Sequence, residues 1–137
     1  MDFSIVWQYL PIMLEGAWVT LWITSVSLVI GLVAAIPLAL ARLAKNPFIA
    51  SPAYVFVLYF RGTPLLVQIF LIYYGSGQFR LELTDLGLLG FFRGPWFCGI
   101  LALVLNTAAY SAEIFRGAIT AVPRNDIEAG RACGMSG

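Results

Sequence analysis

The sequence contains no histidine, one lysine and two cysteines, and only 11% of its 137 residues are charged. Without histidine, the commonest general base and metal ligand is absent. Cys98 lies in an apolar run and Cys133 in a polar tail, which indicates neither a disulfide nor a metal site. The lysine, Lys45, precedes Asn46, so there is no G-x-x-x-x-G-K-[ST] loop for the phosphates of ATP. The apolar segments also lack paired carboxylates and a nucleophile–base set, which makes an enzyme the weakest interpretation.

What the sequence has instead is apolar surface. Hydrophobic residues make up 61% of it, and the mean hydropathy is +0.88. A soluble domain is typically about 45–50% apolar, with about 25% charged residues. The composition therefore predicts an integral membrane protein. The formal net charge of +1 gives no electrostatic reason to expect a nucleic acid partner.

Long stretches of low charge divide the sequence into three predicted crossings of a bilayer. A helix needs about 20 apolar residues to cross about 30 Å of hydrocarbon. Residues 16–41 and residues 94–112 contain no charged side chain. The predicted transmembrane helices are residues 17–41, 52–75 and 95–118. The predicted fold class is therefore an all-α membrane protein with three transmembrane helices.

The N-terminal residues 1–15 lack the basic start of a cleavable signal peptide. Apolar residues recur there at helical spacing from Phe3 to Leu14, which predicts a short amphipathic helix at the membrane surface. A frayed lead-in to the first crossing is the alternative. The first crossing carries small residues four positions apart, which predict a close helix contact: Gly31, Ala35 and Ala39.

The second crossing contains a charge and two helix breakers, Arg61, Gly62 and Pro64. A charge at membrane depth costs several kcal/mol unless it faces protein or water. If Arg61 marked an interface, the helices on either side would each reach only about 20 Å, which is too short to cross. We therefore expect one broken crossing, since broken helices occur where they line a cavity or are buried in protein. The alternative is that Arg61 ends a span and extends to the interface.

One face of the third crossing is polar. Asn106, Tyr110 and Glu113 share it at positions i, i+4 and i+7, so it should face inward. Asn106 is either exposed to a polar pathway or a hydrogen-bonding contact between helices. Glu113 and Arg116 are expected to form an ion pair of little energetic weight at the membrane edge.

The segments outside the crossings are short. Leu86 to Phe92 predicts a small surface helix, and Pro123 ends the third crossing. Asn125 followed by Glu128 resembles a capping box, which predicts the start of a new helix that closes near Gly134.

Positive charge predicts the orientation in the membrane. The second connection has two arginines, Arg80 and Arg93, and the N-terminus has none. The first connection and the C-terminal part hold five basic residues: Arg42, Lys45, Arg116, Arg124 and Arg131. Basic residues concentrate on the cytoplasmic side, so the N-terminus is predicted outside and the C-terminus in the cytoplasm.

Three stretches resemble the permease subunits of ATP-binding-cassette importers for polar amino acids, of the histidine/glutamine type. Residues 60–68, FRGTPLLVQ, are similar to the family's second-helix signature, and residues 106–119, NTAAYSAEIFRGAI, are similar to its third helix. Residues 128–134, EAGRACG, resemble the start of the family's EAA motif, Glu-Ala-Ala-x-x-x-Gly, with Gly130 where a second alanine is usual. With the first helix, the resemblance spans nearly the whole chain.

The resemblance implies a single permease domain over residues 1–137, corresponding to the N-terminal part of a five-helix permease, with a cytoplasmic coupling-helix segment at 125–137. The expected location is the bacterial inner membrane. The expected function is part of a translocation pathway for a polar amino acid or an opine-like solute. The implied partners are an ATP-binding subunit, a second permease subunit (identical or paralogous), an extracytoplasmic amino acid-binding protein and membrane lipid. No cofactor is implied.

The expected site residues form two groups. The pathway-facing group is Arg61, Thr63, Gln68 and Asn106. The group expected to dock the ATP-binding subunit is Glu128, Ala129, Arg131 and Gly134. The family continues beyond its EAA loop with further helices, whereas this sequence stops at Gly137, inside that loop, so a truncated permease is expected. The alternative function is a structural or assembly protein of three helices with no transport of its own.

Overall fold

The computed structural model describes residues 3–135, with side chains described for residues 7–135. This part of the chain is helical and contains no strand. The helices are α1 (Phe3–Leu43), α2 (Pro47–Gly62), α3 (Leu65–Gly75), α4 (Arg80–Asp85), α5 (Leu89–Phe92), α6 (Pro95–Thr120) and α7 (Arg124–Ala132). The predicted all-helical fold class is therefore confirmed.

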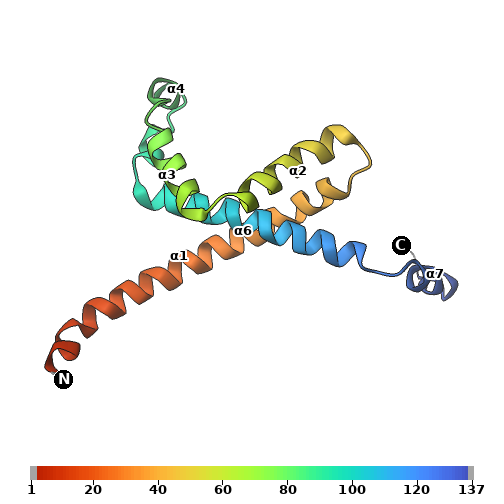
Figure 1. The fold of residues 1–137 in the computed structure, drawn as a ribbon, viewed down its shortest axis with the longest axis horizontal. Helices are drawn as coiled ribbons and strands as arrows, with labels where there is room; N and C mark the ends of the chain where they lie inside the picture. Colours follow the sequence, from red (N-terminus) through yellow and green to blue (C-terminus); the bar gives the residue numbers. More distant parts are fainter. Residues whose placement is uncertain (1–2, 136–137) are drawn as a thin grey trace.

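The long helix α1 replaces the two N-terminal helices that the sequence predicts. It is continuous for 41 residues and contains both Pro11 and Pro37. A proline inside a helix removes one hydrogen bond and bends the axis, and the flanking turns keep the helix intact here. The first turns of α1 leave the line of the rest (Figure 1). The predicted helix over residues 1–15 is thus the first part of α1, and residues 1–2 lie outside the described part of the chain.

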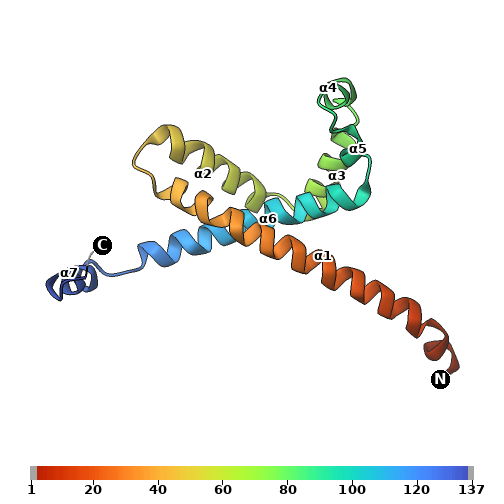
Figure 2. The same cartoon turned by 180° about the vertical axis from the view of Figure 1, so that it is seen from behind.

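Small residues allow α1 and α6 to cross closely, and both ribbon views show the crossing (Figures 1 and 2). Gly31, Ala35 and Ala39 are buried, which confirms the predicted contact stripe. A Cβ added to Gly31 would lie 2.7 Å from Cβ of Thr107 on α6, so only glycine fits at this crossing. The small core of the fold lies beside it and consists of Ala35, Ala39, Val57 and Ala112, flanked by Leu38, Phe56 and Phe115.

The predicted break in the second apolar region is present between α2 and α3, whose axes meet at 109°. α2 begins at Pro47, where the side chain of Asn46 accepts a hydrogen bond from the backbone N–H of Phe48 at 3.0 Å. It ends at Gly62, and Thr63 and Pro64 are extended. Both α2 and α3 contact α6, which runs through the middle of the molecule (Figure 1).

The second connection contains two short helices, of which only α5 lies within the predicted surface helix from Leu86 to Phe92, while α4 precedes it. Gly87 has a φ of +70° and ends α4. The N–H of Leu88 donates to the carbonyl of Leu83 at 2.9 Å, and that of Gly87 donates to Thr84 at 3.0 Å. These two bonds form a Schellman motif, which closes one helix before α5 begins.

The sequence predicts the end of the last helix, α7, but not how it begins. The expected capping box is wrong, because Pro123 occupies the N-cap and the structure shows no side-chain cap bond there. Gly134, with a φ of +83°, follows the helix end as predicted. The N–H groups of Gly134 and Met135 each donate at 3.0 Å, to Arg131 and Gly130 respectively. α7 lies apart from the other helices at one end of the molecule (Figures 1 and 2).

The helix lengths permit two or three crossings of a membrane. α1, from Trp7 to Leu43, and α6 are each long and apolar enough to cross. The bent pair of α2 and α3 meets the same test only when taken together. Many large apolar side chains are exposed, including Trp18 and Phe48, as is typical of a surface that lipid or other transmembrane helices cover.

Candidate functional site

The break between α2 and α3 leaves the carbonyl of Phe60 without a helical donor. In a continuous helix it would accept from residue 64, but Pro64 has no N–H. The side-chain amide of Gln68 replaces that donor. Its Nε2 lies 2.8 Å from the Phe60 carbonyl and 3.0 Å from the Thr63 carbonyl. Gln68 is only 2% exposed, so the sharp turn is held from inside the protein.

The hydroxyl group of Thr63 adds a second bridge across the same break. It donates to the carbonyl of Tyr59 at 2.8 Å and accepts from Nε2 of Gln68 at 2.8 Å. A hydroxyl has one donor and two acceptor positions, so this arrangement uses the donor and leaves one acceptor position. Thr63 therefore links the last turn of α2 to the first turns of α3.

Asn106 ties the break to α6. Its Nδ2 donates to Oε1 of Gln68 at 3.2 Å and to the Phe60 carbonyl at 3.4 Å. One turn further along α6, the hydroxyl of Tyr110 donates to the Arg61 carbonyl at 3.4 Å. The polar face of α6 therefore lies against the break, with Asn106 and Glu113 partly buried as predicted and Tyr110 exposed. Asn106 makes the predicted hydrogen-bonding contact between helices, and its role in a polar pathway stays a prediction.

Arg61 contacts this group through its backbone carbonyl, and its side chain takes no part in the hydrogen bonds. The Arg61 side chain is exposed, and its guanidinium carbon lies 5.5 Å from the ring centre of Tyr110. Among residues 7–135 it has no carboxylate partner. The structure thus brings together Thr63, Gln68 and Asn106 and leaves the Arg61 guanidinium beside them.

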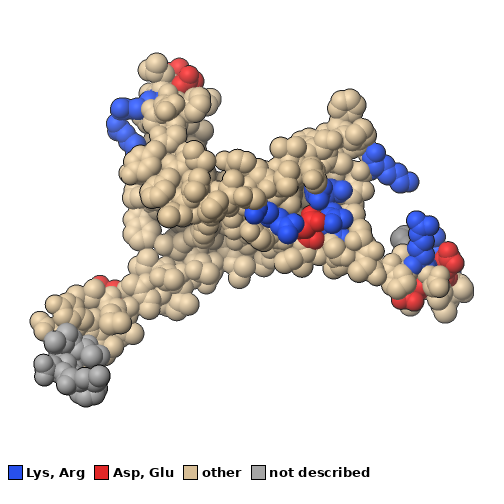
Figure 3. Space-filling model, in the orientation of Figure 1, with Lys and Arg blue, Asp and Glu red and all other residues tan. Residues whose placement is uncertain are grey.

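A charged cluster lies on the same side of the molecule, where α1 ends beside α6. Oε2 of Glu113 lies 3.0 Å from Nη2 of Arg42, and Oε1 accepts from Nε of Arg116 at 2.9 Å and from its Nη2. The side chains of Arg42 and Glu113 are only 14% and 19% exposed. Arg42 also lies over the ring of Tyr54, 4.7 Å from its centre. Figure 3 shows red and blue side chains together in the middle of this face, surrounded by uncharged residues, with the other visible charges towards the ends of the molecule.

The expected ion pair between Glu113 and Arg116 forms, and Arg42 extends it into a cluster. Glu113 contacts two arginines instead of one, and the bond to Arg42 joins two helices. Deleting one partner of an ion pair that is largely removed from water lowers the stability of the protein more than deleting one partner of an exposed pair. Sequence reasoning missed Arg42, because no local spacing connects residues that lie 71 positions apart.

A hollow of about 370 Å³ opens beside the charged cluster. It is lined by Arg42, Tyr54, Val57, Leu58, Arg61, Gly62 and Glu113. Arg61 therefore lines the same cavity as Arg42 and Glu113. We call this cavity the α2–α6 hollow.

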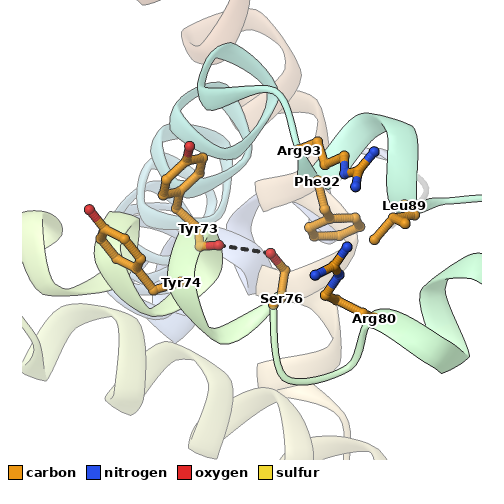
Figure 4. A pocket seen from close by; sticks show the side chains of 8 residues that line it. Tyr73, Tyr74, Ser76, Arg80, Leu89, Phe92 and Arg93 are labelled. Carbon is orange, nitrogen blue, oxygen red and sulfur yellow. Dashed lines mark hydrogen bonds between the residues drawn. The ribbon is translucent and has the colours of Figure 1, made fainter.

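A second hollow, of about 380 Å³, lies at the far end of α3. Its lining residues are Tyr73, Tyr74, Ser76, Gly77, Arg80, Leu89, Phe92 and Arg93. In Figure 4 the guanidinium groups of Arg80 and Arg93 lie on either side of the Phe92 ring. The sequence places both arginines in the second connection and does not predict the hollow. The one feature that points to it is that Arg80 and Arg93 flank an apolar segment.

The predicted docking residues lie on or next to α7, away from the break. Glu128, Ala129 and Arg131 are exposed on the helix, and Gly134 forms its C-terminal turn. α7 packs against no other helix to an extent comparable with the α1–α6 contact in the described part of the chain. The structure thus separates the two predicted groups of site residues by the C-terminal half of α6.

Comparison with known proteins gives close relatives. The chain is 53% identical over 136 residues to a nopaline transport system permease protein of Agrobacterium fabrum, covering 99% of this chain and 56% of that protein. It is 48% identical over 124 residues to a histidine/lysine/arginine/ornithine transport system permease protein of Salmonella typhimurium, covering 88% and 52%. An octopine transport system permease protein of Rhizobium meliloti is 45% identical over 130 residues, covering 95% and 53%.

A solved structure, described as the crystal structure of an amino acid ABC transporter with histidines, has the same fold. Its TM-score is 0.80 at 34% identity, covering 99% of this chain and 59% of that chain. The chain therefore spans somewhat more than half the length of the relatives that it matches.

The sequence profile of one protein family, described as the binding-protein-dependent transport system inner membrane component, matches residues 27–137. This match and the relatives confirm the resemblance to amino acid importer permeases that the three motifs carry. They also confirm the membrane location, and the family and the relatives named here are transport permeases, not enzymes. Family members work in general with a binding protein, a partner permease and an ATP-binding subunit. The chain belongs to the family of inner-membrane components of binding-protein-dependent transport systems.

Proposed function

We propose that this chain forms the membrane-spanning part of an ATP-driven importer subunit and lines the translocation pathway for a polar amino acid or an opine-like solute. The observation that carries this proposal is the hydrogen-bonded break between α2 and α3, in a chain of the permease family. Transporters use interrupted helices near the middle of the membrane to build solute sites, because irregular backbone lining a cavity offers polar groups.

The predicted pathway residues have two distinct roles in this proposal. Gln68 and Asn106 hold the broken helix in place, since their amides bond to the Phe60 carbonyl and to one another. Thr63 keeps one acceptor position for a passing solute. Arg61, whose guanidinium is exposed in the α2–α6 hollow, offers positive charge to the pathway.

Coupling to ATP hydrolysis is proposed to occur through α7. This helix is short, polar and separate from the rest of the chain, so it can insert into a groove on an ATP-binding subunit. Glu128, Ala129 and Arg131 supply its exposed surface, and Gly134 shapes its C-terminal turn. The remaining proposed partners are a second permease subunit, identical or paralogous, and an extracytoplasmic binding protein.

The proposed orientation follows the basic residues. The N-terminus lies outside, α7 lies in the cytoplasm, and the chain crosses the bacterial inner membrane three times, with α2 and α3 together as one broken crossing. The solutes in the names of the relatives support the choice of solute class, since nopaline, octopine and basic amino acids all carry a carboxylate and an amine.

Uptake measurements with labelled solutes test this proposal. Cells that express the permease together with its neighbouring transport genes are compared with cells in which this gene is deleted. We expect uptake of at least one solute among nopaline, octopine, L-arginine and L-histidine to depend on the gene. Equal uptake of every solute by both cells, with the protein present in the membrane, would contradict the proposal.

A further inference from the structure

The α2–α6 hollow carries more positive than negative charge. Arg42 and Arg116 share the single carboxylate of Glu113, and Arg61 faces only the ring of Tyr110. Both ion pairs found among the described side chains belong to this one glutamate. The hollow itself is lined by two guanidinium groups, those of Arg42 and Arg61, against the one carboxylate of Glu113, and Arg116 contacts that carboxylate from outside the lining, so positive charge is in excess. Such an excess is costly at membrane depth unless water or an anion balances it.

The hollow has the size and the lining of a small-molecule site. Its volume of about 370 Å³ lies in the usual range for ligand pockets. Tyr54, Val57 and Leu58 provide an aromatic and apolar wall, while Arg42 and Arg61 provide donors. A guanidinium group binds a carboxylate through two parallel hydrogen bonds, which makes arginine well suited to this ligand.

The Arg61 guanidinium is the free group in this arrangement. Both Arg42 and Arg116 are committed to Glu113, at 3.0 Å and 2.9 Å. The Arg61 side chain is exposed, and the ring of Tyr110 at 5.5 Å limits the positions that it can take. An anion that enters the hollow therefore meets Arg61 without breaking an existing ion pair.

We propose that the α2–α6 hollow binds the carboxylate group of a solute in transit, with Arg61 as its main contact. This inference rests on the proposed transport function and names the part of the solute that the hollow recognises. Arg42 adds to the positive field, and Glu113 keeps Arg42 and Arg116 in place. A phospholipid phosphate group has similar chemistry, and the experiment distinguishes the two sources.

The reactivity of a cysteine placed in the hollow tests its charge. Leu58→Cys is introduced with Cys98→Ala and Cys133→Ala, and the protein is reacted in membrane vesicles with negatively and positively charged methanethiosulfonate reagents. We expect the negative reagent to react about tenfold faster relative to the positive one than at an uncharged site. Arg61→Gln should abolish this preference, and Arg61→Lys should keep most of it. Equal relative rates with and without Arg61 would overturn the proposal.

Protection by added anions identifies the source of the carboxylate or phosphate. We expect 10 mM L-arginine (an order-of-magnitude choice for weak binding) to slow labelling of Leu58→Cys, and L-argininamide, which lacks the carboxylate, to leave it unchanged. If vesicles of phosphatidylglycerol protect the cysteine, vesicles of phosphatidylcholine do not, and L-arginine has no effect, the hollow binds lipid and the proposal is wrong.

Direct binding to the complete transporter gives the second measurement. Arg61→Gln should weaken the binding of L-arginine about tenfold or more, and should change the binding of L-argininamide by less than about twofold. Arg93→Gln, which removes an arginine at the far hollow, is the matched control and should affect neither ligand. An equal loss for both ligands would assign Arg61 a structural role. A transporter that moves no solute but keeps the charge preference at Leu58→Cys would contradict only the transport function.

Discussion

Gln68 shows how one side chain can replace a missing backbone donor. Proline creates the break by removing an N–H, and the glutamine four residues later returns an N–H to the same carbonyl, that of Phe60. The other end of its amide accepts from Asn106, so the bent segment is also joined to α6. The position therefore determines both the geometry of the turn and its place in the bundle.

Gln68→Leu should destabilise the protein. The change leaves the Phe60 carbonyl and the Asn106 amide without their main partner, at a cost of about 1–3 kcal/mol in the free energy of unfolding. The measurement is unfolding of the purified protein in mixed micelles with increasing SDS. The control is Gln78→Leu, which changes an exposed glutamine in the turn after α3. Equal midpoints for Gln68→Leu and the unchanged protein would contradict the role assigned to this amide.

Gly31→Ala should separate α1 from α6. The added Cβ would lie 2.7 Å and 2.8 Å from two carbon atoms of Thr107, so one helix has to move. Overpacking of this kind costs about 1–3 kcal/mol. The same SDS titration measures it, and Gly99→Ala is the control, because the structure shows open space around that position. If Gly31→Ala unfolds at the same SDS concentration as Gly99→Ala, the close crossing is wrong.

Local chemistry at single residues could be predicted from the sequence, and distant pairing could not. Pro64 and Gly62 predict the break, and the spacing of Asn106 and Tyr110 predicts an inward face. The bond between Asn106 and Gln68 depends on the angle of the bend, which no spacing encodes. The Arg42–Glu113 pair likewise depends on where α1 and α6 end beside one another.

At the scale of elements, the bend between α2 and α3 is the feature on which the site depends. An angle of 109° turns α3 back across α6 and places Thr63 and Gln68 against Asn106. A straight helix over the same residues would carry Gln68 away from the Phe60 carbonyl, since residues eight apart lie about 12 Å apart along a helix. The bend and the hydrogen bonds therefore depend on each other.

Pro64→Ala should let α2 and α3 approach a straight helix. Alanine restores the N–H that the Phe60 carbonyl lacks and removes the ring that clashes with the preceding turn. Spin labels at Leu58→Cys and Leu71→Cys, both exposed positions, report the change by pulsed electron spin resonance. The distance between the two backbone positions should grow towards about 20 Å, the length of thirteen residues of continuous helix. An unchanged distance would show that Gln68 and Asn106 alone maintain the bend.

The sequence predicts the end of a helix best where the backbone conformation at that position suits only glycine. Gly134 ends α7 as expected, because its φ of +83° suits glycine. Pro11 did not separate an N-terminal helix from the first crossing, since one proline bends a long helix without ending it. At α7 the proline before Arg124 took the N-cap position from Asn125, so the expected capping box did not form.

At the scale of the whole molecule, α6 connects the two groups of site residues. Asn106 and Glu113 contact the break and the end of α1, and α7 follows the C-terminal end of α6 after a short turn. In the proposed assembly, a movement of α7 is therefore transmitted to the break through α6. An ATP-binding subunit bound to α7, as proposed, would couple its own conformational changes to the break in this way.

Glu128→Lys should reduce ATP-dependent uptake by the assembled transporter about tenfold or more, because it reverses a charge at the proposed docking surface. The amount of protein in the membrane should not change, since Glu128 is exposed and makes no ion pair within the described part of the chain. Asp85→Lys, the same type of change on α4, is the control and should transport normally. Uptake at the unchanged rate in Glu128→Lys would exclude this residue from docking.

The orientation of the chain can be tested with two exposed side chains on opposite sides of the predicted membrane. Phe48 follows the connection with Arg42 and Lys45, and Leu81 lies on α4. Both are at least 80% exposed, so a cysteine at either position should react without disturbing the fold. In a background without Cys98 and Cys133, a membrane-impermeant maleimide added to intact spheroplasts should label Leu81→Cys, and should label Phe48→Cys only after lysis.

The same experiment decides whether α2 and α3 form one crossing. Phe48 lies in the first turn of α2 and Leu81 follows α3, so a single broken crossing places the two cysteines on opposite sides. If the bent pair instead enters and leaves the membrane on one side, both cysteines react before lysis or both only after it. The 109° bend is compatible with either arrangement, and either one places the break between α2 and α3 within the membrane, because re-entrant loops also reach membrane depth. Labelling of both positions from one side would therefore contradict the proposed third crossing and the opposite orientation of α2 and α3.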